Sequence, residues 1–287
     1  MNANVDPLAP YRGRLLGLAY RMLGSRADAE DVLQDAYLRF RDSRAVEKPE
    51  AFLTTMVTRL CLDRLKSARA KREVYVGPWL PEPVLDTEAL SPEAATELAD
   101  DLSFALLLAL ERLSPAERAA FLLHDVFDAS FSDVAAILDK NEAACRQLAA
   151  RARKAVRGSR PAAPASTEVH ARLLAAFGEA VTSGDVTRLA ALLREDAVML
   201  SDGGGVKLAA LNPIRGADKI ARFYIGVSRK YAARRADVRV QGRAINGALG
   251  LLVYLDGVVD QTLSIAVDGD KIAAIYVVRN PEKLTGL

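Results

Sequence analysis

The chain has few of the residues that build metal centres and disulfide frameworks. Two cysteines, Cys61 and Cys145, and two histidines, His124 and His170, occur among its 287 residues. The cysteines lie far apart inside helical patterns, without the spacing of a zinc site or a disulfide framework, so we expect buried reduced thiols. The histidines are isolated, which argues against a metal site. We expect neither a metal nor another cofactor.

Long apolar runs are scarce too. A run such as 104–110 stops far short of the roughly 20 residues that cross a bilayer, and the N-terminus lacks a basic segment followed by an apolar one. The net charge is only +2, which is too small to indicate a nucleic-acid binder by itself. We expect a cytoplasmic protein without membrane contact, long enough for two or three compact domains.

Basic residues are concentrated in two places. Six lie in 59–72 beside a single acid, and six lie in 146–160 with no acid: Arg59, Arg64, Lys66, Arg69, Lys71 and Arg72, then Arg146, Arg151, Arg153, Lys154, Arg157 and Arg160. Solvated helix faces, or charges favoured by the macrodipole at helix ends, would also explain such clusters. The neighbouring motifs must distinguish these explanations from a nucleic-acid interface.

The pattern of the chain changes along its length and divides it into five parts. Helical periodicity covers 1–75, a Pro-punctuated acidic linker follows at 76–100, and a second helical part covers 101–158. A Pro/Ala/Ser linker at 159–167 precedes a mixed part at 168–287, where three helices and hairpin-connected strands predict an α+β cone. The predicted fold is therefore multidomain, with two all-α domains before one α+β domain.

The second helical part ends in two helices, 131–138 and 142–157, joined by a tight polar turn. This spacing is typical of a helix-turn-helix motif, whose second helix enters the major groove of DNA with its N-terminal residues at the base edges. Arg146 and Gln147 are then placed to read bases, while Arg151, Arg153 and Lys154 would contact phosphates. An ordinary helical hairpin with a basic tail is the alternative.

Several of these stretches resemble a known family. Residues 15–40, LLGLAYRMLGSRADAEDVLQDAYLRF, resemble region 2 of extracytoplasmic-function (ECF) sigma factors, and residues 130–157 resemble their region 4. Three short motifs resemble the signatures of group 41 of that family, in which a SnoaL-like domain follows region 4. They are Trp79-Leu80-Pro81-Glu82-Pro83, Asp202-Gly203-Gly204-Gly205 and Asn280-Pro281-Glu282-Lys283-Leu284. All three occur in the family's order.

The resemblance implies a transcription initiation factor whose partners are core RNA polymerase and promoter DNA. Asp31, Gln34 and Asp35 would dock on polymerase, and region 4 would read the minus-35 element as a duplex. The melted minus-10 element would contact Ser43, Arg44, Lys48, Thr58 and Arg59. Members of the family commonly carry Arg-Asn where this chain has Thr58-Arg59, so the chain departs from the family's pattern at this pair.

For the C-terminal domain, the resemblance implies a regulatory role. SnoaL-like cones also host cyclases and isomerases, but no matched acid and base accompany Asp202, so we expect no enzymatic activity. The glycines after Asp202 suggest a bend or a close approach of backbone. The alternative is a DNA-binding regulator fused to a cyclase or isomerase, although such a protein has no use for a region 2.

The three group 41 motifs are expected to form one regulatory contact between the linker and the C-terminal domain. The prolines stiffen the linker around Trp79, which would dock near Asp202. The alternative is a tryptophan packed against the region 2 helices. A small-molecule ligand of the SnoaL-like domain is a further candidate partner.

Overall fold

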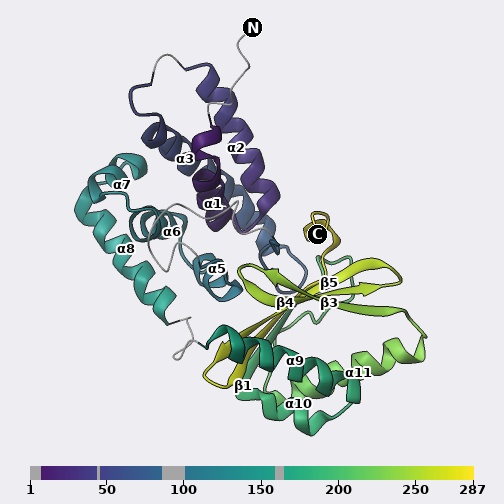
Figure 1. Cartoon of the computed structure of the whole chain (residues 1–287). Helices are drawn as coiled ribbons and strands as arrows, with labels where there is room; N and C mark the ends of the chain where they lie inside the picture. The colour runs from purple at the N-terminus through teal and green to yellow at the C-terminus, as the bar shows by residue number, and fades with distance from the viewer. Residues whose placement is uncertain (1–7, 44–45, 86–100, 159–164) are drawn as a thin grey trace. The chain divides into compact units, whose positions relative to one another are not determined.

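The computed structural model describes residues 8–43, 46–85, 101–158 and 165–287 (Figure 1). The chain forms two compact units. The helical unit comprises Met1–Glu73 and Asp86–Ser159, and the sheet unit comprises Val74–Leu85 and Arg160–Leu287. The segment that contains Trp79 thus belongs to the sheet unit.

The first part of the helical unit contains η1 (Ala9–Tyr11), α1 (Arg12–Leu23), α2 (Arg26–Arg41) and α3 (Pro49–Glu73). Helix α1 ends at Gly24, which adopts a left-handed conformation with φ 70°, as is common at helix C-termini. Ser25 then caps α2 by accepting a hydrogen bond from the Asp28 amide. The apolar stripe expected in 29–40 is buried at Ala29, Val32, Leu33 and Ala36.

The second part contains α5 (Phe104–Glu111), α6 (Pro115–Phe121), the π-helical turn η3 (Leu122–Val126), α7 (Phe131–Leu138) and α8 (Glu142–Arg157). Capping boxes start α6 at Ser114 and α7 at Ser130. Asp139 ends α7 in a left-handed conformation with φ 52°. Helices α7 and α8 have the bounds that the sequence pattern predicts for the helix-turn-helix.

The sheet unit carries one six-stranded sheet in the order β2-β1-β6-β5-β4-β3. Its strands are β1 (Leu193–Asp202), β2 (Ile214–Arg215), β3 (Val238–Ile245), β4 (Ala248–Leu255), β5 (Val258–Asp268) and β6 (Lys271–Val278). Strands β1 and β6 are parallel and the other pairs are antiparallel. Helices α9 (Thr167–Ser183), α10 (Val186–Leu192) and α11 (Ala217–Ala233) cover one face of the sheet (Figure 1). The predicted α+β fold is confirmed.

Strand β1 did not emerge from the sequence pattern. Its first residues, Arg194 to Asp196, are charged and favour strands weakly. The strand forms because it pairs in parallel with β6, with Leu200 opposite Tyr276 and Asp202 opposite Val278. This pairing places Asp202 at the end of a strand beside the start of the C-terminal tail.

Candidate nucleic-acid and regulatory sites

Helix α8 presents a basic face to solvent. Its inner side buries Cys145, Leu148, Ala149, Ala152 and Val156. The expected base-reading residues Arg146 and Gln147 are exposed, as are Arg151 and Lys154, while Arg153 is half-buried. Asn141 caps the start of the helix, and its side chain accepts a hydrogen bond from the Ala144 amide. The face that would meet DNA in a helix-turn-helix is therefore available on this element.

Acidic side chains hold three arginines of this face. Arg146 pairs with Glu142 in the preceding turn and lies 5.3 Å from the centroid of the Phe131 ring. Arg151 Nε donates to Glu117 Oε1 at 2.7 Å, and Arg153 Nε donates to Asp125 Oδ1 at 2.6 Å. The hydrogen bond with the Ser114 hydroxyl is the main cause that lowers the pKa of Glu117 below its ordinary value, and the hydrogen bond from Arg151 is the second cause. Glu117 thus links the capping box of α6 to α8.

The residues expected at the minus-10 element lie in several environments. Ser43 caps α2 by donating to the Phe40 carbonyl at 2.6 Å, Lys48 is exposed just before α3, and Arg44 lies outside the described residues. Thr58 lies in a different environment from these residues. Its side chain is fully buried in this form and its hydroxyl donates to the Thr54 carbonyl at 2.7 Å, so its contact with DNA stays a prediction.

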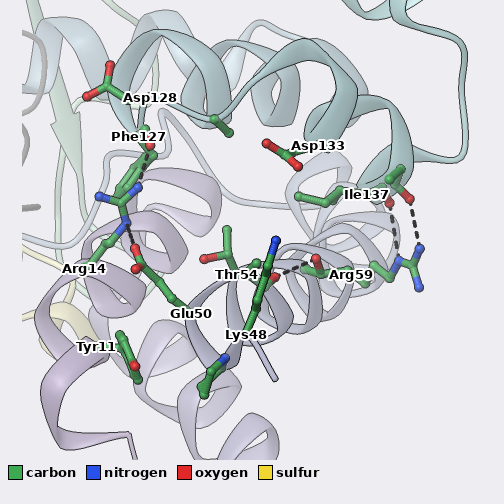
Figure 2. A pocket seen from close by; sticks show the side chains of 15 residues that line it. Tyr11, Arg14, Lys48, Glu50, Thr54, Arg59, Phe127, Asp128, Asp133 and Ile137 are labelled. Carbon is green, nitrogen blue, oxygen red and sulfur yellow. Dashed lines mark hydrogen bonds and ion pairs between the residues drawn. The ribbon is translucent and has the colours of Figure 1, made fainter. Parts of the chain in front are cut away.

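Arg59, the other predicted residue of this pair, is exposed and reaches from α3 to the end of α7. Its Nε donates to the Ile137 carbonyl at 3.3 Å, and its Nη2 donates to the Ala136 carbonyl at 3.2 Å. Figure 2 shows these bonds at the rim of a cavity of about 680 Å³ between the two parts of the helical unit. Lys48 and Thr54 also line this cavity. The surface expected to take the minus-10 strand therefore faces α7 in this form.

Two further arginines join the two parts of the helical unit. Arg14 donates to the Phe127 carbonyl at 2.5 Å and pairs with Glu50 (Figure 2). Arg118 is 2% exposed, donates to the Met22 carbonyl at 2.5 Å and pairs with Glu111 at 2.7 Å. Burial lowers the pKa of Arg118 to about 10. These contacts stabilise the form in which the two parts are packed together.

The expected polymerase-binding residues lie on α2. Asp31 and Gln34 are exposed and Asp35 is half-buried. Arg64 of α3 pairs with both carboxylates at 3.3 Å. The side chain of Asp31 retains 63% of its exposure, so this acidic face remains accessible to a basic partner.

The carboxylate of Asp202 is the centre of the sheet unit's contact with the linker. It is fully buried. Its Oδ1 accepts from the Tyr75 hydroxyl at 2.6 Å and from the Gly204 amide at 3.0 Å. Its Oδ2 accepts from the Leu80 amide at 2.9 Å and from Lys283 Nζ at 2.7 Å. A buried carboxylate with a cation and three further donors is well compensated for its lost hydration.

The glycines after Asp202 allow another segment to approach closely. Gly204 has φ 64°, and a Cβ built on it would lie 2.4 Å from Asn280 Cγ. A Cβ on Gly203 would lie 2.2 Å from the Lys207 carbonyl oxygen. Asn280 in turn donates from its backbone to the Asp202 carbonyl at 2.9 Å. The bend and close approach suggested by the three glycines are both present.

Trp79 docks within the sheet unit. The Lys283 ammonium lies 4.2 Å from the centroid of the Trp79 ring and donates to the Leu80 carbonyl at 2.5 Å. Farther along the linker, Val84 exchanges two hydrogen bonds with Asn246 in the β3–β4 turn. Most of the other predicted regulatory residues are also buried or half-buried. Those buried are Leu80, Pro81, Pro83, Gly203 and Leu284, those half-buried are Glu82, Gly204 and Pro281, and Gly205 is exposed. The structure thus brings the three motifs together.

Sequence reasoning missed Tyr75. Its hydroxyl donates to Asp202 and accepts from Asn280 Nδ2 at 2.9 Å, so it touches two of the three motifs. Burial is the main cause that raises the pKa of Tyr75, and the hydrogen bond to Asp202 is the second cause. The phenol therefore keeps its proton and remains a donor. An aromatic residue just before the proline-rich motif was the available signal. The buried Asp260, held by Lys207 at 2.9 Å and Arg279 at 2.8 Å, was also missed.

The described residues contain no cluster of three metal-ligating side chains. Within the same residues, the structure has no helix long and apolar enough to cross a membrane.

Comparison with known proteins identifies the class. Residues 8–71 match the family model "Sigma-70 region 2", and residues 103–156 match "Sigma-70, region 4". The chain is 41% identical to the "ECF RNA polymerase sigma factor SigJ" of Mycobacterium tuberculosis, in an alignment that covers 98% of this chain and 93% of the relative. It is 29% identical to the "Probable ECF RNA polymerase sigma factor SigI" of the same species, over 96% and 93% of the two chains.

A solved structure agrees with these relatives. The crystal structure of Mycobacterium tuberculosis extracytoplasmic function sigma factor SigJ superposes with a TM-score of 0.76 at 39% identity, covering 96% of both chains. The chain belongs to the ECF RNA polymerase sigma factors, with an α+β domain behind region 4. It is a transcription initiation factor and not an enzyme, and the alternative of a regulator fused to a cyclase or isomerase is not favoured.

Proposed function

We propose that this sigma factor reads the minus-35 element with the exposed face of α8. Arg146 and Gln147, in the first turns of the helix, would contact base edges in the major groove. Arg151, Arg153 and Lys154 would contact phosphates and set the helix position. The exposure of Arg146, Gln147, Arg151 and Lys154 supports the assignment.

Region 2 would contact both polymerase and the melted strand. Asp31, Gln34 and Asp35 would pair with basic and polar groups of core RNA polymerase. The minus-10 strand would lie along Ser43, Arg44, Lys48 and Arg59, with a base flipped out of the duplex at a cost of a few kcal/mol that stacking and edge contacts offset. Because core polymerase has to be in the same compartment, the protein would act in the cytoplasm.

Run-off transcription with purified core polymerase tests this function. The chain and core enzyme together should give discrete transcripts from promoters selected out of a genomic library, whereas the chain alone should bind the same DNA weakly and with a steep salt dependence. Failure to initiate at any selected promoter would contradict the function. Tight sequence-specific binding by the free chain at physiological salt would contradict the division of work between the sigma factor and polymerase.

The Asp202 contact would regulate the factor through the linker. Helix α3, the last helix of the first part, ends at Glu73, so docking of Val74–Leu85 would attach the end of this helix to the sheet unit. Tyr75 and Leu80 both contact the same carboxylate, so the docked segment curves around Asp202 and is shorter than an extended chain. Residues 86–101, which could reach about 55 Å when fully extended, then provide the rest of the connection to region 4.

Docking would favour the packed form of the helical unit. Elements at minus-10 and minus-35 lie about 25 base pairs apart, or about 85 Å at 3.4 Å per base pair, so regions 2 and 4 must separate to reach both. The packed form instead holds Arg59 on the carbonyls of α7. A docked linker would restrain separation, and release of the linker would raise transcription.

The tryptophan provides a matched test of this regulation. Trp79→Ala removes the ring beside Lys283 and should raise run-off transcription several-fold, within the range of ordinary coupling energies. Val258→Ala, at a 71% exposed apolar residue of the same unit, serves as the control and should leave transcription unchanged. Equal activity of both variants and the wild type would contradict regulation by the linker, without affecting the sigma-factor function itself.

A further inference from the structure

The Lys283 ammonium occupies a cage that two aromatic rings, a carboxylate and a carbonyl form around it. It lies 4.2 Å from the centroid of the Trp79 ring and 5.3 Å from that of the Tyr75 ring. It donates to Asp202 Oδ2 at 2.7 Å and to the Leu80 carbonyl at 2.5 Å. Its side chain is only 11% exposed. Aromatic faces with an anionic partner are a general arrangement for binding ammonium groups.

We propose that this cage is a binding site for small aliphatic primary amines, in which Lys283 acts as the ligand that the chain itself supplies. An external amine would take the place of the lysine ammonium. Because the cage includes Tyr75, Trp79 and Leu80 of the linker, the bound amine would keep the linker docked when the C-terminal segment with Lys283 is displaced from the cage. The proposal concerns binding to the sheet unit and does not depend on the proposed transcriptional role.

The geometry selects among ammonium ions. Two of the contacts are hydrogen bonds that the ammonium donates, so a ligand needs at least two N–H groups. A primary ammonium has three, whereas a quaternary ammonium has none and could contact only the rings and the charge. The buried Asp202 carboxylate makes the positive charge essential, because an uncharged ligand would leave that anion without a counterion.

The attachment of Lys283 to the chain determines when an external amine can bind. The lysine lies in the short 3-10 helix η4 (Pro281–Lys283), four residues before Leu287. A tethered ligand competes at an effective concentration on the order of millimolar. An external amine therefore binds more weakly to the wild type than to a variant that lacks the lysine side chain.

Lys283→Ala in the full-length chain gives the direct test. The truncation removes three carbons and the ammonium, which is the composition of n-propylammonium, so this amine is the probe. Trp79 is the only tryptophan of the chain and its fluorescence reports the cage. Propylammonium should change the emission saturably and raise the melting temperature of the variant, whereas tetramethylammonium at equal ionic strength should be at least about tenfold weaker.

Three further chains check the location of the site. Lys283→Met fills the cage without a charge and should not respond to propylammonium, and Asp202→Asn combined with Lys283→Ala should lose the response. The wild type should bind at least about tenfold more weakly than Lys283→Ala. A deletion of residues 281–287 replaces Lys283→Ala if circular dichroism shows that variant to be unfolded. Absence of saturable binding in the folded variant, or equal binding by Lys283→Met or the wild type, would overturn the proposal.

Discussion

The guanidinium of Arg59 in region 2 donates a hydrogen bond to the backbone carbonyl of Ile137 in region 4 at 3.3 Å. Arg59 is one of the residues expected to contact the minus-10 strand, and Ile137 lies in the first helix of the helix-turn-helix. The bond therefore uses a proposed DNA-contacting group to hold the two DNA-binding regions together. In the proposed assignment, promoter binding and this packed form compete for the same side chain.

A first prediction concerns a neighbouring contact that lies outside the proposed DNA surface. Arg14→Ala removes the bond to the Phe127 carbonyl and the pair with Glu50, so it should loosen the packed form and raise run-off transcription several-fold. Arg14→Lys, which keeps a donor and the charge, should lie between the alanine variant and the wild type. Transcription by Arg14→Ala at or below the wild-type level, with helicity retained, would count against competition between the two forms.

The second prediction separates base contacts from phosphate contacts on α8. Arg146→Ala should weaken the preference for the minus-35 sequence by about 1–3 kcal/mol, whereas Lys154→Ala should weaken binding to all sequences and lower the salt slope by about 1. Polymerase holoenzyme binding to matched and mutated minus-35 duplexes, measured over a range of salt concentrations, distinguishes the two effects. Identical behaviour of the variants would contradict the assigned roles.

A third prediction addresses the buried ion pair of the sheet unit. Asp202→Ala leaves Lys283 without its anion and three other donors without their acceptor, which should cost about 3–5 kcal/mol of unfolding free energy. Denaturant unfolding followed by Trp79 fluorescence measures this cost. Glu195→Ala, at an exposed acid of β1, is the matched control and should change stability by less than about 0.5 kcal/mol.

The fourth prediction uses two glycines. Gly204→Ala places a methyl group against Asn280 at a positive φ, so it should destabilise the sheet unit by at least about 1–3 kcal/mol. Gly178→Ala, in α9 where nothing lies within 4 Å of a Cβ built on the glycine, should instead stabilise the unit by about 0.5–1 kcal/mol, because alanine favours helices. Thermal unfolding of both variants tests the pair, and a neutral Gly204→Ala would contradict the close approach of the tail.

A fifth prediction follows from the lowered pKa of Glu117. A carboxyl whose pKa is lower in the folded state stabilises that state above its unfolded-state pKa and loses this contribution as the pH falls through the folded-state value. The free energy of unfolding of the wild type should therefore exceed that of Glu117→Gln by about 1 kcal/mol at neutral pH, which is the usual contribution of a helix cap. Unfolding of the helical unit followed by circular dichroism should show this difference disappearing in acid.

Local signals explain what the sequence alone predicted well. Helix bounds in region 4 were predictable because Ser114, Ser130 and Asn141 each cap a helix through contacts three residues away. Strand β1 was not predictable, since its pairing with β6 joins residues far apart in the chain. The burial of Thr58 was not predictable for a related reason. Its neighbours Val57 and Leu60 are core residues, and the helix rotation that also buries Thr58 depends on tertiary packing.

The regulatory contact was partly predictable. The resemblance supplied the three motifs and the expectation that they meet, and the glycines indicated a close approach. Tyr75 could not be assigned, because its partner Asp202 is 127 residues away. The cage around Lys283 likewise requires side-chain positions from both the linker and the tail, which no local pattern encodes.

We propose that linker docking at Asp202 favours the packed form of regions 2 and 4. The most direct test is the distance between spin labels on two introduced cysteines, Arg39→Cys on α2 and Ala150→Cys on α8, which are both exposed positions. The native Cys61 and Cys145 are buried, so the labels should attach to the introduced cysteines. We predict one short distance in the free protein, a broader and longer distribution after Asp202→Asn, and a longer distance in the polymerase complex. An unchanged distribution after Asp202→Asn, in a folded variant, would contradict the claim.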